Sequence, residues 1–183
     1  MTAPFALAAG RLHLRPMEQS DFDALCAILQ DPQVMYAYEH AFSDTEVQDW
    51  LDRQRMRYEK DGFGLWAAVR PDTGELIGQC GLTMQPTPLG DVMEVGYLFR
   101  RDCWHQGYAT ECARACMNYG FWALDADAVY SIIRDNNAPS RAVAVRNGMQ
   151  VVRQFTKHYY GVDMPHLIYC ARRPAPHKDG GRV

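Results

Sequence analysis

The sequence lacks the features that mark membrane, secreted and nucleic-acid-binding proteins. None of its apolar runs approaches the ~20 residues that a membrane-spanning helix needs. The apolar stretch 4–9 has no basic residue before it, which argues against a secretory signal peptide. Basic residues do not outnumber acidic ones, since 19 Lys and Arg stand against 22 Asp and Glu, for a formal net charge of −3. We therefore expect a cytoplasmic protein that acts neither in a membrane nor on nucleic acid.

The cysteines and histidines lack the spacing of a disulfide framework or a metal site. The six cysteines are scattered through apolar segments, which fits a reducing compartment. Cys112 and Cys116 would share one helix face, where a metal or redox pair is conceivable. Packing is the favoured interpretation, because a free cysteine behaves as a small hydrophobe. The six histidines show no ligand pattern, so we expect no metal.

What the sequence does contain fits a single globular domain. Its 183 residues allow a sizeable core, and 48% apolar with 22% charged residues is the composition of a soluble globular protein. No repeat or linker divides the chain. We expect the domain to span residues 11–173, with a loose N-terminal arm at residues 1–10 and a disordered tail at residues 174–183.

Hydrophobic periodicity predicts seven strands and four helices. The expected strands are residues 11–15, 63–70, 75–83, 92–99, 129–134, 150–157 and 164–171. The expected helices begin after the residues Ser20, Ser43, Gly107 and Asn137. Ser43 with Glu46 has the pattern of a capping box, and Asn137 is placed to cap the last helix. The order β-α-α-β-β-β-α-β-α-β-β indicates an α/β (α+β) fold with six to seven strands and about four helices.

Three segments are harder to interpret. Residues 85–90 are expected to form a loop between strands. Residues 34–42 are aromatic and could form a short helical turn or a loop that lines a substrate site. Arg53, Arg55 and Arg57 fall largely off the apolar face of the second helix, where a solvated face is favoured and contact with an acidic partner stays open.

The stretch from residue 92 to residue 111 has the order strand, basic turn, glycine, helix. A helix N-terminus exposes free N–H groups and partial positive charge, and both bind phosphate well. Gly107 lets the backbone approach a ligand closely, and Arg100 and Arg101 add positive charge. The stretch is neither a nucleotide P-loop nor a dinucleotide fingerprint, because neither spacing is present. A pyrophosphate cradle and an ordinary strand–turn–helix both remain open on geometry alone.

Two motifs in this stretch resemble the acetyl-CoA signature of the GNAT N-acetyltransferase superfamily. The first is Glu94-Val95-Gly96-Tyr97, and the second is Trp104-His105-Gln106-Gly107-Tyr108-Ala109-Thr110-Glu111. Gly107 and Ala109 match the last two fixed positions of the pattern Gln/Arg-x-x-Gly-x-Gly/Ala. Trp104 stands at the Gln/Arg position, a departure common in the branch that includes the ribosomal-protein N-terminal acetyltransferases, which this chain resembles most.

A later segment is similar to the second signature of the same superfamily. It consists of Asn137-x-x-Ser140 and Arg146-Asn147-Gly148-Met149, where the family often has Lys-x-Gly-Phe at the second part. In the family the Asn contacts the coenzyme A arm and the Ser lies near the thioester sulfur. The element order also resembles the GNAT fold, so the resemblance covers residues 11–173 and implies a mixed, mostly antiparallel sheet.

The resemblance implies acetyl-CoA as a co-substrate and a set of residues that bind it. A splayed fourth strand would hold the pantetheine arm with its backbone, and the N–H groups of the glycine turn would bind the pyrophosphate. The expected coenzyme A-binding residues are Tyr97, Leu98, Phe99, Trp104, His105, Gln106, Gly107, Tyr108, Ala109, Thr110 and Asn137.

The chemistry of amine acetylation assigns candidate catalytic roles. An amine attacks a thioester only when neutral, so Glu94 is our candidate general base, acting directly or through water. Many relatives protonate the departing thiolate with a Tyr on the helix after the fifth strand. No Tyr occurs between Ser131 and Lys157, so Ser140 is our candidate general acid. Gly96 is placed to distort its strand and turn an N–H group outward toward the thioester oxygen.

We therefore expect an N-acetyltransferase that moves an acetyl group directly to a primary amine, either a protein N-terminus or a small molecule. The alternative is a non-catalytic acyl-CoA sensor or interaction module on the same fold. The sequence leaves the acceptor and the oligomeric state open, with a homodimer as one option for the latter.

Overall fold

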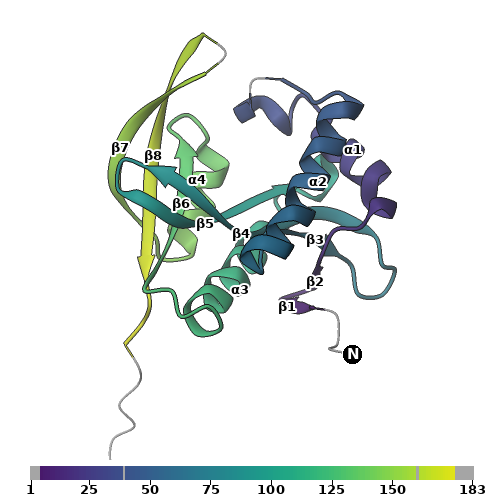
Figure 1. Ribbon diagram of the computed structural model, residues 1–183, viewed down its shortest axis with the longest axis horizontal. Helices are drawn as coiled ribbons and strands as arrows, with labels where there is room; N and C mark the ends of the chain where they lie inside the picture. Colours follow the sequence, from purple (N-terminus) through teal and green to yellow (C-terminus); the bar gives the residue numbers. More distant parts are fainter. Residues whose placement is uncertain (1–4, 39, 160, 176–183) are drawn as a thin grey trace, which may run out of the picture.

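The computed structural model of the chain describes residues 5–38, 40–159 and 161–175 (Figure 1). These residues form one eight-stranded sheet in the order β1-β2-β3-β4-β5-β6-β8-β7. All neighbouring strands are antiparallel except β5 and β6, which are parallel. The strands are β1 (Leu7–Ala9), β2 (Leu12–Arg15), β3 (Leu65–Val69), β4 (Leu76–Thr87), β5 (Gly90–Phe99), β6 (Ala128–Arg134), β7 (Gln150–Tyr159) and β8 (Val162–Arg172).

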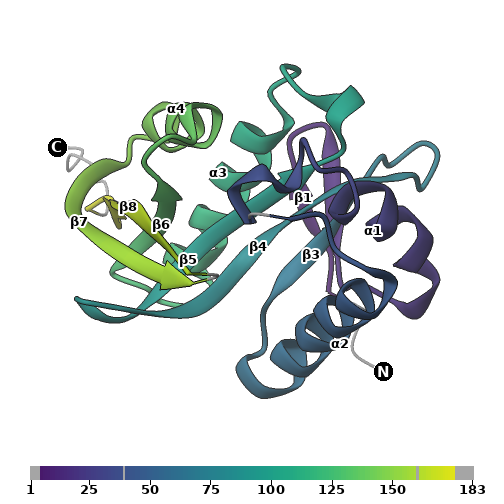
Figure 2. The same ribbon diagram turned by 90° about the horizontal axis from the view of Figure 1, so that it is seen from above.

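Two helices cover each face of the sheet. They are α1 (Phe22–Leu29), α2 (Asp44–Asp61), α3 (Tyr108–Trp122) and α4 (Ala138–Arg146), with 3₁₀ turns η1 (Gln19–Asp21), η2 (Met35–Tyr38) and η3 (Arg101–Cys103). One buried cluster packs α3 and α4 against one face, and a second packs α1 and α2 against the other face around β3 and β4. The β7–β8 hairpin stands apart from α1 and α2, with η2 between them (Figures 1 and 2).

The N-terminal segment differs from the expected loose arm. Residues 7–9 form β1, which pairs with β2, and the ring of Phe5 stacks on Trp66 with centroids 4.6 Å apart. Three residues are too few for periodicity to identify a strand, so the sheet has one strand more than expected. The tail prediction falls mostly on residues 176–183, which lie outside the described residues.

The hairpin of β4 and β5 is longer than expected. Residues 85–87 belong to β4 and Gly90 begins β5, so most of the expected loop at 85–90 is strand. Pro86 pairs with Asp91 near the tip of this hairpin. Pro86 lacks an N–H group and made the segment resemble a loop, but a strand near a hairpin tip tolerates a missing donor.

The predicted helix caps at Ser43 and Asn137 are confirmed, but the expected start after Ser20 is wrong, because Ser20 lies inside η1 and the capping box there is formed by Glu18 and Asp21. The Ser43 backbone N–H donates to Glu46 Oε2 over 2.8 Å, and the Glu46 N–H donates back to Ser43 Oγ over 3.3 Å. Residues 35–38 form the η2 turn, one of the two alternatives for that segment. Cys112 and Cys116 are unpaired by disulfides and buried in the core, as the packing interpretation expects. None of the helices that the described residues form is long and apolar enough to cross a membrane.

Candidate active site

A fork opens in the sheet where the parallel strands β5 and β6 separate. Their only registered pair is Glu94 with Tyr130. On its other side β5 stays paired with β4 along its whole length, from Gly90 to Phe99. Beyond Val95, the edge of β5 that faces β6 is therefore free of ladder bonds, and it offers backbone groups to a ligand that enters as an added strand.

Alternate residues of β5 direct their backbone groups into the fork. The Arg100 N–H donates to Ile77 O on β4 over 2.9 Å, whereas Val95 O accepts from Ser131 Oγ on β6 over 3.3 Å. Because direction alternates along a strand, Tyr97 and Phe99 face the fork and Leu98 faces β4. The expectation that Leu98 contributes backbone groups to the pantetheine site is therefore wrong. Its side chain packs on the α1–α2 face instead.

The fork does not depend on a distortion at Gly96. The register between β4 and β5 runs without a shift from the pair Gly78–Phe99 to the pair Thr87–Gly90. The expected bulge at Gly96 is therefore absent, and the separation of β5 from β6 is what exposes the edge. Gly96 itself faces β4 with its backbone, as Leu98 does, so it does not turn an N–H into the fork.

Two side chains close the narrow end of the fork. Ser131 Oγ donates to Val95 O, and the Ile132 N–H donates to Glu94 Oε1 over 3.1 Å. These bonds replace ladder bonds at the point where the ladder ends. Burial raises the pKa of the Glu94 carboxyl to about 7, although the Ile132 N–H, Lys157 and Arg57 act in the opposite direction. A carboxyl with this pKa can gain or lose a proton near neutral pH.

The first turn of α4 lies on the face of β5 opposite to the Glu94 side chain. Tyr97 alternates with Glu94 along the strand, so their side chains lie on opposite faces. The Tyr97 hydroxyl donates to Ser140 O over 3.0 Å, and Asn137 Oδ1 accepts from the Ser140 N–H over 3.1 Å. Burial raises the pKa of Tyr97, so its hydroxyl stays protonated. The predicted Glu94 and Ser140 thus flank the fork from its two faces.

The turn before α3 has the backbone shape of an anion site. His105 has φ of 59° and Gly107 has φ of 87°, both in the left-handed region. Left-handed residues in a turn can direct successive N–H groups into one concavity. None of the described residues accepts a hydrogen bond from the N–H groups of residues 105–110. A left-handed non-glycine residue is uncommon, and its occurrence here supports a functional constraint.

Trp104 differs from its expected role. Its N–H donates to Arg101 O over 3.2 Å and is not free for a pyrophosphate. Its indole Nε1 donates to Phe99 O over 2.8 Å, which links the end of β5 to the turn. Trp104 therefore holds the end of β5 next to the turn that precedes α3. The free N–H groups of that turn begin at His105.

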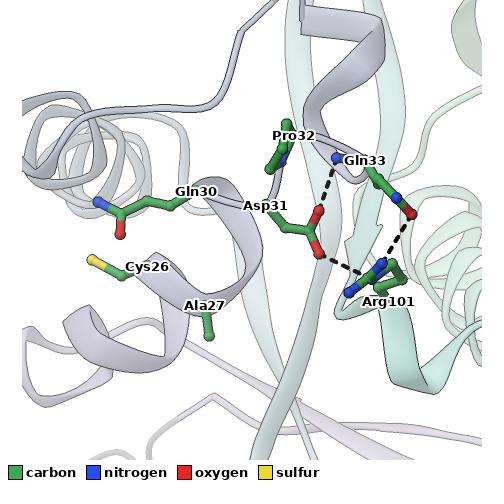
Figure 3. Close-up of a pocket in the computed structure, with 7 residues that line it drawn as sticks. All are labelled: Cys26, Ala27, Gln30, Asp31, Pro32, Gln33 and Arg101. Atoms are coloured by element: carbon green, nitrogen blue, oxygen red, sulfur yellow. Dashed lines mark hydrogen bonds and ion pairs between the residues drawn. The ribbon is translucent and has the colours of Figure 1, made fainter.

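Arg100 and Arg101, which precede the anion site formed by the N–H groups of residues 105–110 (the cradle), are already paired with acids. Arg100 binds Asp102 at 2.7 Å and Glu75 at 2.9 Å. Arg101 binds Asp31 at 3.2 Å, and its Nη1 donates to Gln33 Oε1 over 3.0 Å (Figure 3). Arg101 also borders a hollow of about 560 Å³ beside the C-terminal end of α1, lined in addition by Cys26, Ala27, Gln30, Asp31, Pro32 and Gln33. The positive potential of the cradle therefore comes chiefly from its backbone N–H groups.

The acid in the first turn of α3 is turned away from those N–H groups. Glu111 Oε2 accepts from the Arg11 N–H over 3.0 Å, and the Arg11 guanidinium also binds Glu111 and the carbonyl of Gln106. Arg11 neutralises Glu111, so its carboxylate does not occupy the helix N-terminus. Among the described residues, no three His, Cys, Asp or Glu side chains lie close enough together to hold a metal ion.

Comparison with known proteins identifies this arrangement. A sequence profile of the acetyltransferase (GNAT) domain matches residues 11–150. The chain belongs to the GNAT acetyltransferase family. Among curated proteins it is 35% identical over 158 residues to the uncharacterized protein YkkB of Bacillus subtilis, covering 86% of this chain and 92% of that one. It is 32% identical over 133 residues to the uncharacterized N-acetyltransferase p20 of Bacillus licheniformis, covering 71% and 74%.

Solved GNAT structures share the fold. An acetyltransferase of the GNAT family from Bacillus anthracis superposes with a TM-score of 0.80 at 20% identity, covering 92% of this chain and 99% of that one. RimL, a ribosomal L7/L12 alpha-N-protein acetyltransferase solved in complex with coenzyme A, superposes with a TM-score of 0.76 at 16% identity, covering 92% and 98%. Structural neighbours thus include the branch that the motifs suggested.

The structure of this GNAT domain also reveals polar groups that sequence reasoning missed. Tyr97 was expected to act through its backbone alone, yet its hydroxyl reaches the first turn of α4. Ser131, on β6, closes the fork from the other strand. Strand alternation could have placed both side chains on the α4 face, but only the pairing of β5 with β6 brings them together.

The cradle geometry predicts that His105 acts through its backbone. Replacement of His105 by Gly keeps the left-handed conformation and removes the imidazole. We expect the affinity for coenzyme A, measured by isothermal titration calorimetry, to stay within about threefold of the wild-type value. His105→Asn, which also tolerates this conformation, is the matched variant. A tenfold loss of affinity in both variants would show that the imidazole itself contacts the ligand.

Proposed function

We propose that this GNAT protein transfers the acetyl group of acetyl-CoA directly to a primary amine. One observation carries the proposal: an open fork between β5 and β6 has a carboxyl group with a pKa of about 7 at its closed end. The free N–H groups before α3 provide an anion site at the end of the same strand. Such an arrangement fits a long substrate with a diphosphate at one part and a reactive thioester at another.

The chain's own residues would hold acetyl-CoA in two ways. The N–H groups of residues 105–110 would bind the pyrophosphate, supported by the dipole of α3. The carbonyl of Tyr97 and the N–H of Phe99, which face the fork, would pair with the amides of the pantetheine arm, whereas Phe99 O already accepts from Trp104 Nε1. Asn137 uses its side-chain oxygen to cap α4, which leaves its NH₂ group to donate to the same arm.

Glu94 would accept a proton from the amine, directly or through one water molecule. An α-amine with a pKa of ~7.7–8.0 is partly neutral near pH 7, whereas a lysine amine with a pKa of ~10.4 is almost fully charged. A base with a pKa of about 7 matches that task, because it is largely ionised just above neutral pH and is still basic enough to take the proton.

The transfer then proceeds by attack of the neutral nitrogen on the thioester carbon. The carbonyl oxygen gains negative charge, and the Tyr97 N–H, which faces the fork, is placed to stabilise it. As the nitrogen–carbon bond forms, the nitrogen gives its second proton to water, the carbon–sulfur bond breaks, and the thiolate of coenzyme A leaves. Ser140 Oγ would protonate this thiolate, and the Tyr97 hydroxyl is the second candidate because it lies against the Ser140 backbone.

Two variants separate the candidate acids. Ser140→Ala is expected to lower kcat about tenfold to a hundredfold, while the affinity for acetyl-CoA changes little. Tyr97→Phe removes only the hydroxyl and is expected to lower kcat less than Ser140→Ala does. Steady-state kinetics with calorimetric binding of coenzyme A measures both effects. An unchanged kcat in Ser140→Ala, with a large loss in Tyr97→Phe, would transfer the role to Tyr97.

The overall proposal is tested by the release of free coenzyme A thiol from acetyl-CoA in the presence of amines. The set should include short peptides with free N-termini, amino acids and polyamines. RimL is a ribosomal-protein acetyltransferase by its name, which makes a protein N-terminus one acceptor class to include here. We expect amine-dependent release. Binding of acetyl-CoA without release for any amine would instead favour a non-catalytic acyl-CoA sensor, an alternative supported by the missing Tyr on α4.

A further inference from the structure

Several charged side chains share the sheet face on which Glu94 lies. Residues paired across strands project to the same face, and every second residue of a strand does so too. Glu94 pairs with Tyr130, and Arg134 lies four residues farther along β6. Arg134 pairs with His166, which pairs with Phe155, and Lys157 is two residues beyond. Lys157 on β7 therefore lies on the Glu94 face, which is also the face that α2 covers over β3 and β4.

Two cations approach Glu94 from opposite elements. Arg57 on α2 lies against Gly64, whose carbonyl lies against Gly81, and Gly81 pairs with Gly96, two residues beyond Glu94 on β5. Lys157 approaches from the β7 side of the same face, and both cations lower the pKa of the Glu94 carboxyl. Arg53, one turn before Arg57, lies near enough to lower the pKa of Arg57 in turn. Figure 2 shows α2 and the β7–β8 hairpin on the two sides of the long β4–β5 strands. The surroundings of the proposed base are thus positively charged.

These cations lack the acidic partners that their neighbours have. Arg57 donates to Gln54 Oε1 over 3.1 Å, and Lys157 Nζ lies 5.8 Å from the centroid of the Phe155 ring. Neither makes an ion pair with any described residue. By contrast, Arg55 on the outer side of α2 pairs with Asp52 at 3.7 Å, and His158 next to Lys157 is 2.7 Å from Asp163. Asp61 acts on Arg57 only from beyond ion-pair distance.

We propose that the acceptor is a primary amine that carries a carboxylate or phosphate group near the reacting nitrogen, and that Arg57 and Lys157 bind this anionic group. The inference rests on the proposed function. A simple cationic amine would be repelled by two cations as it approached Glu94, because like charges at short range in a partly buried site cost several-fold more than in water. An anionic group on the same molecule pairs with both cations and brings the nitrogen to the base.

The test compares matched amines that differ in one charge. The first pair is alanine and alaninamide, compared at equal concentrations of the neutral amine. The second pair is two tetrapeptide amides that begin with Asp or with Asn. We expect the anionic member of at least one pair to have a kcat/KM about tenfold higher or more, and the pair that shows it distinguishes a free amino acid from a polypeptide N-terminus. Equal or higher kcat/KM for the neutral members of both pairs would overturn the inference.

Variants tie the preference to these two side chains. Arg57→Gln and Lys157→Gln should each reduce the preference about fivefold or more through KM, while the calorimetric affinity for coenzyme A stays unchanged. Arg55→Gln is the matched control on the same helix and should keep the preference. A preference that survives in both Arg57→Gln and Lys157→Gln would contradict the assignment. Absence of turnover for every amine tested would refute the proposed transfer itself, and the inference with it.

Discussion

Gly107→Val is expected to weaken coenzyme A binding by about a hundredfold or more. Gly107 has φ of 87°, where a β-branched residue is strongly disfavoured, at a cost of roughly 2–3 kcal/mol. A Cβ atom at this position would meet only Arg11 Nη2 at 3.5 Å and Glu111 Oε1 at 3.7 Å, which are ordinary contacts with flexible side chains. Valine would therefore act by turning the N–H groups of the cradle away from the ligand, and not by a clash in the core.

Isothermal titration calorimetry with coenzyme A measures this effect, and a matched glycine controls for strain. Gly74 has φ of 71° in the turn between β3 and β4, and a Cβ atom there meets nothing within 4 Å. Gly74→Val should cost similar stability and leave the affinity unchanged. Gly107→Ala, which strains the backbone less, should fall between wild type and Gly107→Val. Wild-type affinity in Gly107→Val would show that the pyrophosphate binds elsewhere.

Glu94→Gln is expected to lower kcat/KM by roughly a hundredfold or more above pH 7, with little change in coenzyme A affinity. The amide oxygen of glutamine can still accept the Ile132 N–H, so the closed end of the fork keeps its shape. The wild-type kcat/KM should rise with pH through the Glu94 pKa of about 7, and the variant should lose that step. Asp91→Asn, at an exposed position of the same strand, should behave as wild type.

Glu94→Gln should also change the stability of the folded state, in a direction that follows from the raised pKa of Glu94. Burial raises the Glu94 pKa in the folded state above its ordinary value of 4.5, so the protonated form favours folding and ionisation opposes it. The stability present below pH 4.5 is lost as the pH rises to about 7, by about 3 kcal/mol. Glu94→Gln should therefore raise Tm above pH 7 and change it little at pH 4.5. A variant less stable than wild type at pH 8, with unchanged kcat/KM, would remove Glu94 from both roles.

Local patterns were sufficient for most of the elements. The capping box at Ser43, the Asn137 cap and the helix after Gly107 all follow from short-range chemistry, and the structure has each of them. β1 was not identified because its three residues are held by pairing with β2 and by Phe5 on Trp66, and both are contacts between distant segments.

The site was only partly predictable because it depends on how strands pair. The sequence placed Tyr97, Leu98 and Phe99 together, but only the bond from Arg100 to β4 shows that Leu98 faces away from the fork. The absence of a Tyr on the helix after β6 was visible from the sequence. The Tyr97 hydroxyl that reaches that helix from β5 was not, because its position requires the β5–β6 separation.

A crystal structure with bound coenzyme A tests the central claim most directly. We expect diphosphate oxygens within about 3 Å of several N–H groups of residues 105–110, and a pantetheine amide paired with the backbone of Tyr97. A diphosphate bound away from this turn, or a fork filled by the chain's own side chains while coenzyme A sits elsewhere, would contradict it.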